Sequence, residues 1–219
     1  MPQPKAHLAK EFIEDLARTR ELFSIFVLHG FSSFDRNTPA VAKEEPAALR
    51  SIDKWDLTAF LFFEAAAKFE GFCMQAFTIE VKRWYEVTAT RADFVMGSSD
   101  AGTQRTFGWA DPKRLNERGK NLFPKDRFFG DFFNHIGSDV YNRLIQAHKI
   151  RNRIAHDPGV ARESITKLAS QLHVPKRHQI GLSTGRLLFG YPVKAASSDK
   201  YFFVFLRAYE NCARTFGAF

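Results

Sequence analysis

The chain has 219 residues, of which 45% are hydrophobic and 26% are charged, values that are ordinary for a soluble globular protein. Its 32 Lys and Arg outnumber 24 Asp and Glu, and the formal charge of +8 favours a polyanionic partner such as nucleic acid or an anionic membrane surface, although solubility alone also accounts for it. The two isolated cysteines argue against a disulfide scaffold, and the polar start argues against a signal peptide. The apolar windows are too short for a membrane span. We therefore expect a cytoplasmic protein whose thiols, Cys73 and Cys212, are buried and free.

Apolar residues recur at helical spacing through most of the chain. This periodicity predicts helices at residues 6–29, 53–88, 112–122, 124–136, 139–156, 161–172 and 199–216. Asp53, Asp111 and Gly137-Ser138 supply the caps and breaks that helix ends require. Polar segments at 31–50 and 96–110, rich in proline or glycine, predict connections between helices.

Residues 173–198 follow the helical pattern least well. Within them, residues 180–189 around Ser183-Thr184-Gly185 predict a small hairpin, and the wider segment is expected to be either that hairpin or an irregular insertion. The 24 phenylalanines are expected to fill wide gaps between helices, and a surplus also fits a dimer interface. The simplest account is a single all-α domain over residues 1–219.

One short segment places a cation, an amide and an imidazole just before an expected helix end. It reads Arg151-Asn152-Arg153-Ile154-Ala155-His156, and Asp157-Pro158 follows it. The helix should end there, because a residue before proline disfavours helical torsions. The negative end of the helix dipole stabilises an imidazolium, so we expect it to raise the pKa of the His156 imidazole toward neutrality, where proton transfer is useful.

The spacing of Arg151 and His156 is not specific by itself, because Arg143 and His148 repeat it nearby. Two features distinguish the first pair. Asn152 can donate to a phosphate or orient the imidazole, whereas Leu144 stands at the equivalent position of the second pair. His156 lies at an expected helix end, whereas His148 lies in mid-helix.

Helix geometry sets a condition on this pair. At about 100° per residue, Arg151 and His156 point about 140° apart, so one straight helix cannot aim both at the same atom. Either the last turn unwinds, or a second copy of the chain supplies the missing partner. A packing role is the alternative, with Arg, Asn and His on the solvated side of an ordinary helix and His156 as its C-terminal capping group.

A metal site is a weaker interpretation of the same region. His135, His148 and His156 are close in sequence, but they lack the tight His-x3-His spacing and third ligand that zinc prefers. No glycine-rich phosphate loop and no Gly-x-Ser-x-Gly elbow are present either.

The hexapeptide from Arg151 to His156 closely resembles the Arg-polar-x3-His motif of the HEPN superfamily, the higher eukaryotes and prokaryotes nucleotide-binding domain. The helix around Phe69-Glu70-Gly71-Phe72 is similar to the central helix of its bacterial members, and the resemblance covers roughly residues 54–172. It implies an up-and-down helical bundle that forms a homodimer, with two motif copies facing each other in a basic cleft.

The resemblance also implies an activity and its residues. Many members are metal-independent endoribonucleases of toxin or antiviral-defence type, which need no cofactor and are often accompanied by an antitoxin or another defence protein. By position, Arg151, Asn152 and His156 would be catalytic, and the flanking Lys149 and Arg153 would bind RNA. Other members are inactive, so the alternative is a helical module that binds RNA, a nucleotide or a partner protein without catalysis.

Overall fold

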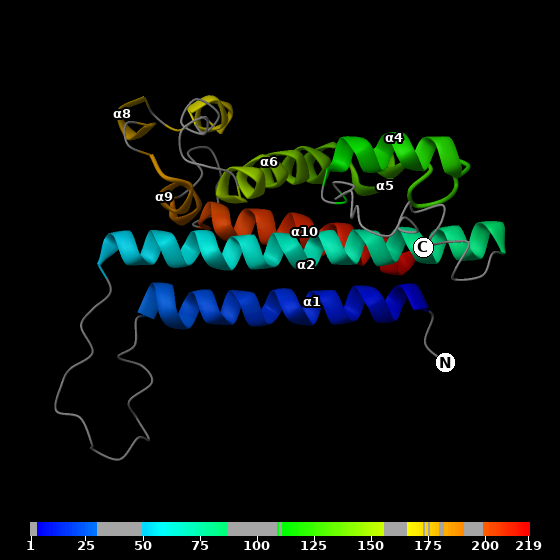
Figure 1. Ribbon diagram of the computed structural model, residues 1–219, viewed down its shortest axis with the longest axis horizontal. Helices are drawn as coiled ribbons and strands as arrows, with labels where there is room; N and C mark the ends of the chain where they lie inside the picture. Colours follow the sequence, from blue (N-terminus) through cyan, green and yellow to red (C-terminus); the bar gives the residue numbers. More distant parts are fainter. Residues whose placement is uncertain are drawn as a thin grey trace, which may run out of the picture. The chain divides into compact units, whose positions relative to one another are not determined.

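The computed structural model of the chain describes residues 4–29, 50–86, 109, 111–155, 166–172, 174, 176–179, 182–190 and 199–219. Over these residues the protein is a packed bundle of eight α-helices and one π-helical segment, without a strand (Figure 1). The elements are α1 (Pro4–Leu22), η1 (Phe23–His29), α2 (Ser51–Tyr85), α4 (Pro112–Leu122), α5 (Phe132–Ile136), α6 (Ser138–Ala155), α8 (Lys176–Gln179), α9 (Thr184–Phe189) and α10 (Tyr201–Ala218). The predicted all-α class is confirmed.

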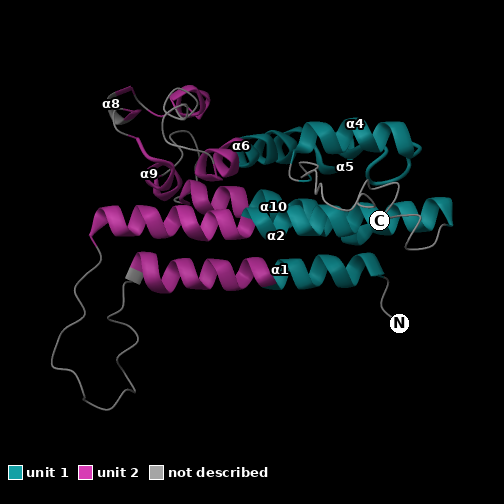
Figure 2. Cartoon of the chain, viewed as in Figure 1, with its two compact units in different colours: residues 1–14, 66–148, 207–219 teal, residues 15–65, 149–206 magenta. Residues whose placement is uncertain are grey.

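The chain divides into two compact units, which Figure 2 colours separately. Unit 1 comprises residues 1–14, 66–148 and 207–219, and unit 2 comprises residues 15–65 and 149–206. The four long helices, α1, α2, α6 and α10, each contribute residues to both units. The single domain expected over residues 1–219 stays a prediction.

Unit 1 is built around aromatic rings on α2. Phe72 stacks on Phe12 of α1 at 4.8 Å between ring centroids, and Phe69 stacks on Tyr209 of α10 at 4.3 Å. Further buried rings come from Phe128, Phe129, Phe132 and Phe216. Phenylalanine therefore fills the gaps between the helices of this unit, as the composition predicts.

Unit 2 has an aromatic core of its own. Phe23 of η1 stacks on Phe202 of α10 at 4.1 Å, and Phe62 of α2 meets Phe205 edge to face at 6.0 Å. The buried Tyr201 hydroxyl donates to the carbonyl of Leu172 at 2.9 Å. This bond satisfies the only polar atom of the tyrosine side chain and ties helical residues 166–171 to α10.

Several helix ends lie where the sequence predicts them. Helix α4 begins after Asp111, whose carboxylate accepts from the Lys113 amide at 3.0 Å, and α6 begins after Gly137, which has a φ of 79°. Helix α2 begins two residues before the predicted cap. Asp53 lies inside the first turn and accepts from the Arg50 amide at 3.1 Å, the return half of a capping box.

The predicted helix at 124–136 is wrong over its first part, and only α5 is helical. Residues 124–131 form consecutive turns, in which Arg127 N donates to Pro124 O and Gly130 N donates to Arg127 O. A Cβ at Gly130 would lie 1.8 Å from Pro124 O. The chain thus folds back on itself too tightly for a continuous helix.

The predicted hairpin at 180–189 is also wrong. Thr184–Phe189 is α9, and the Ser183 hydroxyl caps it by accepting from the Arg186 amide at 3.1 Å. Gly185, a turn residue in the predicted hairpin, lies inside the helix, where a Cβ would meet Trp55 O at 1.8 Å. The glycine is there for close packing of α9 on α2 rather than for a reverse turn.

Parts of the prediction fall outside the described residues. These are the segment at 31–49, the last residues of the helix expected at 53–88, the connection at 96–110 apart from Trp109, the stretch from His156 to residue 165, and residues 191–198 of the expected insertion. Among the helices that the structure describes, none is long and apolar enough to cross a membrane.

Candidate functional site

Helix α6 carries the motif and buries one face. Leu144, Ala147 and Ile150 are buried at helical spacing. Arg151 follows Ala147 by one turn, so it lies at the edge of this buried face and is half-buried itself. The helix therefore fixes the backbone of Arg151 through the apolar residues that precede it.

Two contacts within unit 2 hold the Arg151 guanidinium. Its Nη1 donates to Oδ1 of Asn152 at 3.3 Å, and its central carbon lies 5.6 Å from the centre of the Phe63 ring of α2. A guanidinium near an aromatic face is attracted by the ring quadrupole and keeps its charge. The result is a positioned cation on α6, four residues before Ala155, the last residue of the helix that the structure describes.

The side chain of Asn152 contacts Arg151, its neighbour in the sequence. We expected its amide to contact a phosphate or the imidazole, and the structure shows its carbonyl oxygen accepting from Arg151. Adjacent residues on a helix usually diverge, and the length of the arginine side chain bridges the difference. Asn152 is therefore a positioning residue for Arg151.

The two flanking cations differ in exposure. Lys149 is exposed, and its Nζ donates to Oε1 of Gln171 at 3.4 Å, whereas Arg153 is half-buried. Together with Arg151 they place three cations within five residues of α6. Such an arrangement can neutralise a polyanion that passes this part of the helix.

His156 is the motif residue on which proton transfer depends, and it lies outside the described residues with Asp157 and Pro158. The structure describes α6 as far as Ala155, so the predicted end of this helix also lies outside the described residues. The roles of His156 and of the Asp157-Pro158 stop remain predictions.

The second Arg–His pair has partners of its own in unit 1. Arg143 Nη1 donates to Gln146 Oε1 at 3.0 Å, and His148 Nε2 lies 4.0 Å from Asp111 Oδ2 at the start of α4. The His148 side chain is only 20% exposed. The first contact lies within α6 and the second connects α6 to the start of α4, so this pair has a structural role, as its mid-helix position suggests.

Two features of the site escape a reading of local sequence. Phe63 and Gln171 are distant in the chain and carry no signal of their own. The second feature is the distribution of charge, which the total for the chain does not reveal. Residues 149–206 hold ten Lys or Arg against three Asp or Glu, a formal charge of +7 in a chain whose total is +8.

Within the described part of the chain, no three His, Cys, Asp or Glu side chains gather as metal ligands would. Comparisons of the chain with family models, with curated proteins and with solved structures found no match.

Proposed function

We propose that the protein is a metal-independent endoribonuclease of toxin or antiviral-defence type, which acts as a homodimer with a composite active site. The observation that carries the proposal is the Arg151 guanidinium, which Asn152 and Phe63 hold near the end of α6, five residues before His156. An antitoxin or another defence protein is the expected partner besides RNA.

The reaction uses the nucleophile that RNA carries. The 2′-oxygen attacks the adjacent phosphorus and the bond to the 5′-oxygen breaks, leaving a 2′,3′-cyclic phosphate and a 5′-hydroxyl. A base must take the 2′-proton and an acid must protonate the leaving 5′-oxygen, and His156 side chains from two protomers can divide these roles. Arg151 guanidiniums stabilise the charge that develops on the phosphoryl oxygens.

The requirement for two copies follows from the helix. Arg151 and His156 diverge by about 140° if the helical path continues, so an Arg151 of one protomer and a His156 of the other form the site more readily than one chain does. Positive charge in residues 149–206 supports an RNA substrate, because each neutralised phosphate adds affinity.

Cleavage of a labelled RNA in the presence of EDTA tests the proposal. The unaltered protein is expected to cut RNA and to leave the matching DNA intact, because DNA lacks the 2′-hydroxyl. Arg151→Ala and His156→Ala are each expected to abolish cleavage while the helical circular dichroism is unchanged. Arg143→Ala is the matched control, because it removes an arginine from the same helix outside the motif, and it should cut normally. Undiminished cleavage by the His156 variant would remove this residue from the mechanism.

A non-catalytic binding module is the second candidate. Both contacts of Arg151 described above are with residues of its own chain, Asn152 and Phe63. Such contacts also suit an arginine that shapes a binding surface. This function predicts RNA binding that Arg151→Ala weakens, without cleavage under any condition. Expression separates the two, since an active nuclease should be toxic to its host unless His156 is replaced.

A further inference from the structure

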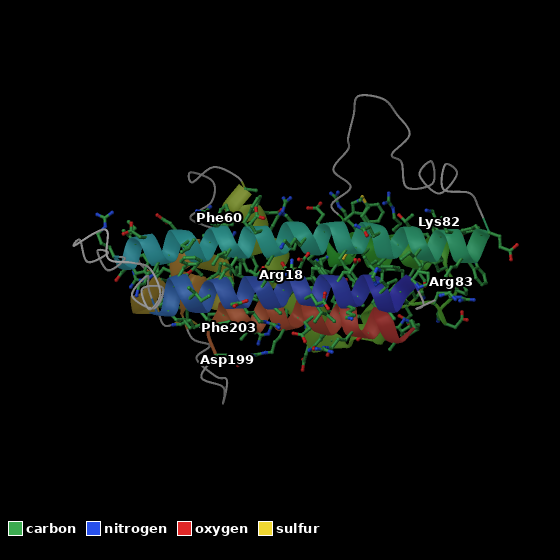
Figure 3. The ribbon with its side chains drawn as sticks, turned by 90° about the horizontal axis from the view of Figure 1, so that it is seen from below. Arg18, Phe60, Lys82, Arg83, Asp199 and Phe203 are labelled. Carbon is green, nitrogen blue, oxygen red and sulfur yellow. The ribbon has the colours of Figure 1, made fainter. Side chains whose placement is uncertain are left out.

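Unit 1 exposes aromatic rings and cations at the end of α2, in the last turn of α4 and in the turns after α4. We call this region the Trp84 surface, and it consists of Lys82, Arg83, Trp84, Tyr85, Lys120, Lys125 and Arg127. Figure 3 shows Lys82 and Arg83 near the C-terminal end of α2. None of these residues belongs to the motif on α6.

The two aromatic rings of this surface are exposed yet held in place. Trp84 is 42% exposed and Tyr85 is 43% exposed. The Arg127 guanidinium lies 4.9 Å from the centre of the Trp84 ring, and the Tyr85 hydroxyl donates to Leu122 O at 2.6 Å. Large rings that remain in water while their orientation is fixed are typical of binding surfaces, because little entropy is lost when a ligand stacks on them.

The charge around these rings is positive. Residues 82–86 and 120–127 contain five cations and two acids, Glu86 and Asp126, a formal charge of +3. Asp126 lies 4.0 Å from Arg127, whose side chain is still 39% exposed. The cations thus exceed the carboxylates available to neutralise them inside the surface.

A pocket of about 490 Å³ adjoins the surface beside α4. Two cations, Arg114 and Arg118, and one acid, Glu117, line it, as does Leu122, whose carbonyl accepts from Tyr85. The Arg118 guanidinium lies 5.0 Å from the centre of the Trp109 ring, another pairing of a planar cation with an aromatic face. When a base stacks on Trp84, the neighbouring nucleotide could place its base or its phosphate against the planar and cationic groups of this pocket.

We propose that the Trp84 surface binds single-stranded RNA by stacking bases on Trp84 and Tyr85 and pairing phosphates with the surrounding cations. Every base has a flat face, so aromatic rings interleaved with Lys and Arg suit a single strand of any sequence. An anionic membrane fits less well, because the described neighbours of the two rings are mostly cations and include only Leu122 as an aliphatic residue that could insert with them. The identification of this strand as the substrate depends on the proposed function, whereas the binding itself does not.

Binding is measured by fluorescence anisotropy with a labelled 2′-O-methyl oligoribonucleotide of about 12 nucleotides, a length that spans a typical single-strand site. Methylation blocks the attacking oxygen, so the probe cannot be cut and binding is separated from cleavage. Trp84→Ala is expected to weaken binding about tenfold, the effect of losing one stacked base, whereas Trp84→Phe should retain most of the affinity. Phe60→Ala is the matched control, since it removes another exposed ring of α2, and it should bind as the unaltered protein does.

The phosphate contribution is tested by charge reversal. The double variant Lys82→Glu/Arg83→Glu should weaken binding and flatten its dependence on salt, because fewer counterions are released. The control Lys10→Glu/Arg18→Glu makes the same change in net charge on exposed residues of α1 and should have a smaller effect.

Equal affinities for the Trp84→Ala and Phe60→Ala variants, or for the two charge-reversed variants, would overturn the proposal. So would binding of anionic vesicles or polyglutamate in place of the oligonucleotide. Failure of the proposed function gives a different result, in which the probe binds at the Trp84 surface but unmodified RNA is never cut.

Discussion

At the scale of single residues, the position of Arg151 has one local and one distant cause. Asn152, its neighbour in sequence, accepts from the guanidinium, and Phe63 of α2 lies beside it. A reading of the sequence finds the arginine and the asparagine, because they belong to one motif. It cannot find Phe63, because only the folded chain brings α2 to α6.

Another residue-scale feature is a buried ion pair in unit 1. Lys5 and Glu80 form a salt bridge, with side chains that are 3% and 2% exposed. Breaking such a pair leaves an uncompensated charge in the core, so Glu80→Gln is expected to lower the free energy of unfolding by about 3–5 kcal/mol. The double variant Lys5→Met/Glu80→Leu should recover most of this loss in urea titrations. Equal destabilisation by the single and double variants would contradict this account.

The two cysteines allow a prediction about pH. Burial raises the pKa of the Cys73 thiol, with smaller contributions from Cys212 and Glu70, and burial also raises the pKa of Cys212. The ordinary pKa of a cysteine thiol is 9.0, and unfolded thiols ionise above that pH. The folded thiols therefore stay neutral at a pH where the unfolded thiols are already ionised. The contribution of the two thiols to the free energy of unfolding is therefore complete below pH 9.0 and decreases as the pH rises above 9.0.

We accordingly expect neither thiol to react with a disulfide reagent at pH 8 in the native protein, because the thiolate is the nucleophile. Both should react when the protein is unfolded in urea. The absorbance of the released thiolate measures the reaction, and a fast stoichiometric reaction of the folded chain would show that a cysteine is accessible.

At the scale of helices, alanine substitutions at two glycines test how closely α2 and α4 pack against their neighbours. A Cβ at Gly71 of α2 meets nothing within 4 Å, whereas a Cβ at Gly119 of α4 would lie 1.9 Å from Phe129 O. Gly71→Ala should therefore stabilise the protein by about 0.5–1 kcal/mol, through helix propensity alone. Gly119→Ala should lower the melting temperature, because α4 must move away from the Phe129 backbone. Opposite signs in thermal unfolding are the expected result, and a stable Gly119 variant would contradict the observed packing.

The sequence predicted helices wherever local signals and apolar periodicity agreed. Helix α4 shows this, because Asp111-Pro112 marks its start and its apolar stripe covers its length. The predictions failed at Pro124 and Gly185, where the deciding fact is a close approach to another backbone. At Gly185 the other backbone is that of Trp55, which is distant in sequence, so turn chemistry alone suggested a hairpin. At Pro124 the close approach is to Gly130, six residues away, and the proline alone suggested the start of a longer helix.

At the scale of the whole molecule, the proposed activity depends on two chains. If each site combines Arg151 of one protomer with His156 of the other, the variants Arg151→Ala and His156→Ala complement each other. Mixing the two inactive proteins, with exchange of protomers, is then expected to restore part of the cleavage of a labelled RNA, because each heterodimer keeps one Arg151 and one His156 on different chains. The recovery should be only partial, because the second His156 that shares the proton transfers is missing. A mixture that remains as inactive as its components would contradict a site made of one Arg151 and one His156 from different chains.

Charge is the other whole-molecule property on which the account depends. Residues 149–206 supply most of the net positive charge, and the Trp84 surface adds a second basic region in unit 1. The total of +8 indicated a polyanionic partner from the sequence. The total did not indicate where that partner binds, because exposure and aromatic neighbours determine which cations are available.

The most direct test of the central claim is the chemistry of the RNA ends produced in EDTA. The unaltered protein is expected to leave a 2′,3′-cyclic phosphate and a 5′-hydroxyl, detected by mass spectrometry and by labelling of the 5′ end without prior phosphatase treatment. Arg151→Ala, purified in the same way, should give neither end. Intact RNA after incubation with the unaltered protein, or fragments that carry a 5′-phosphate, would contradict the claim that this chain cleaves RNA through its 2′-hydroxyl.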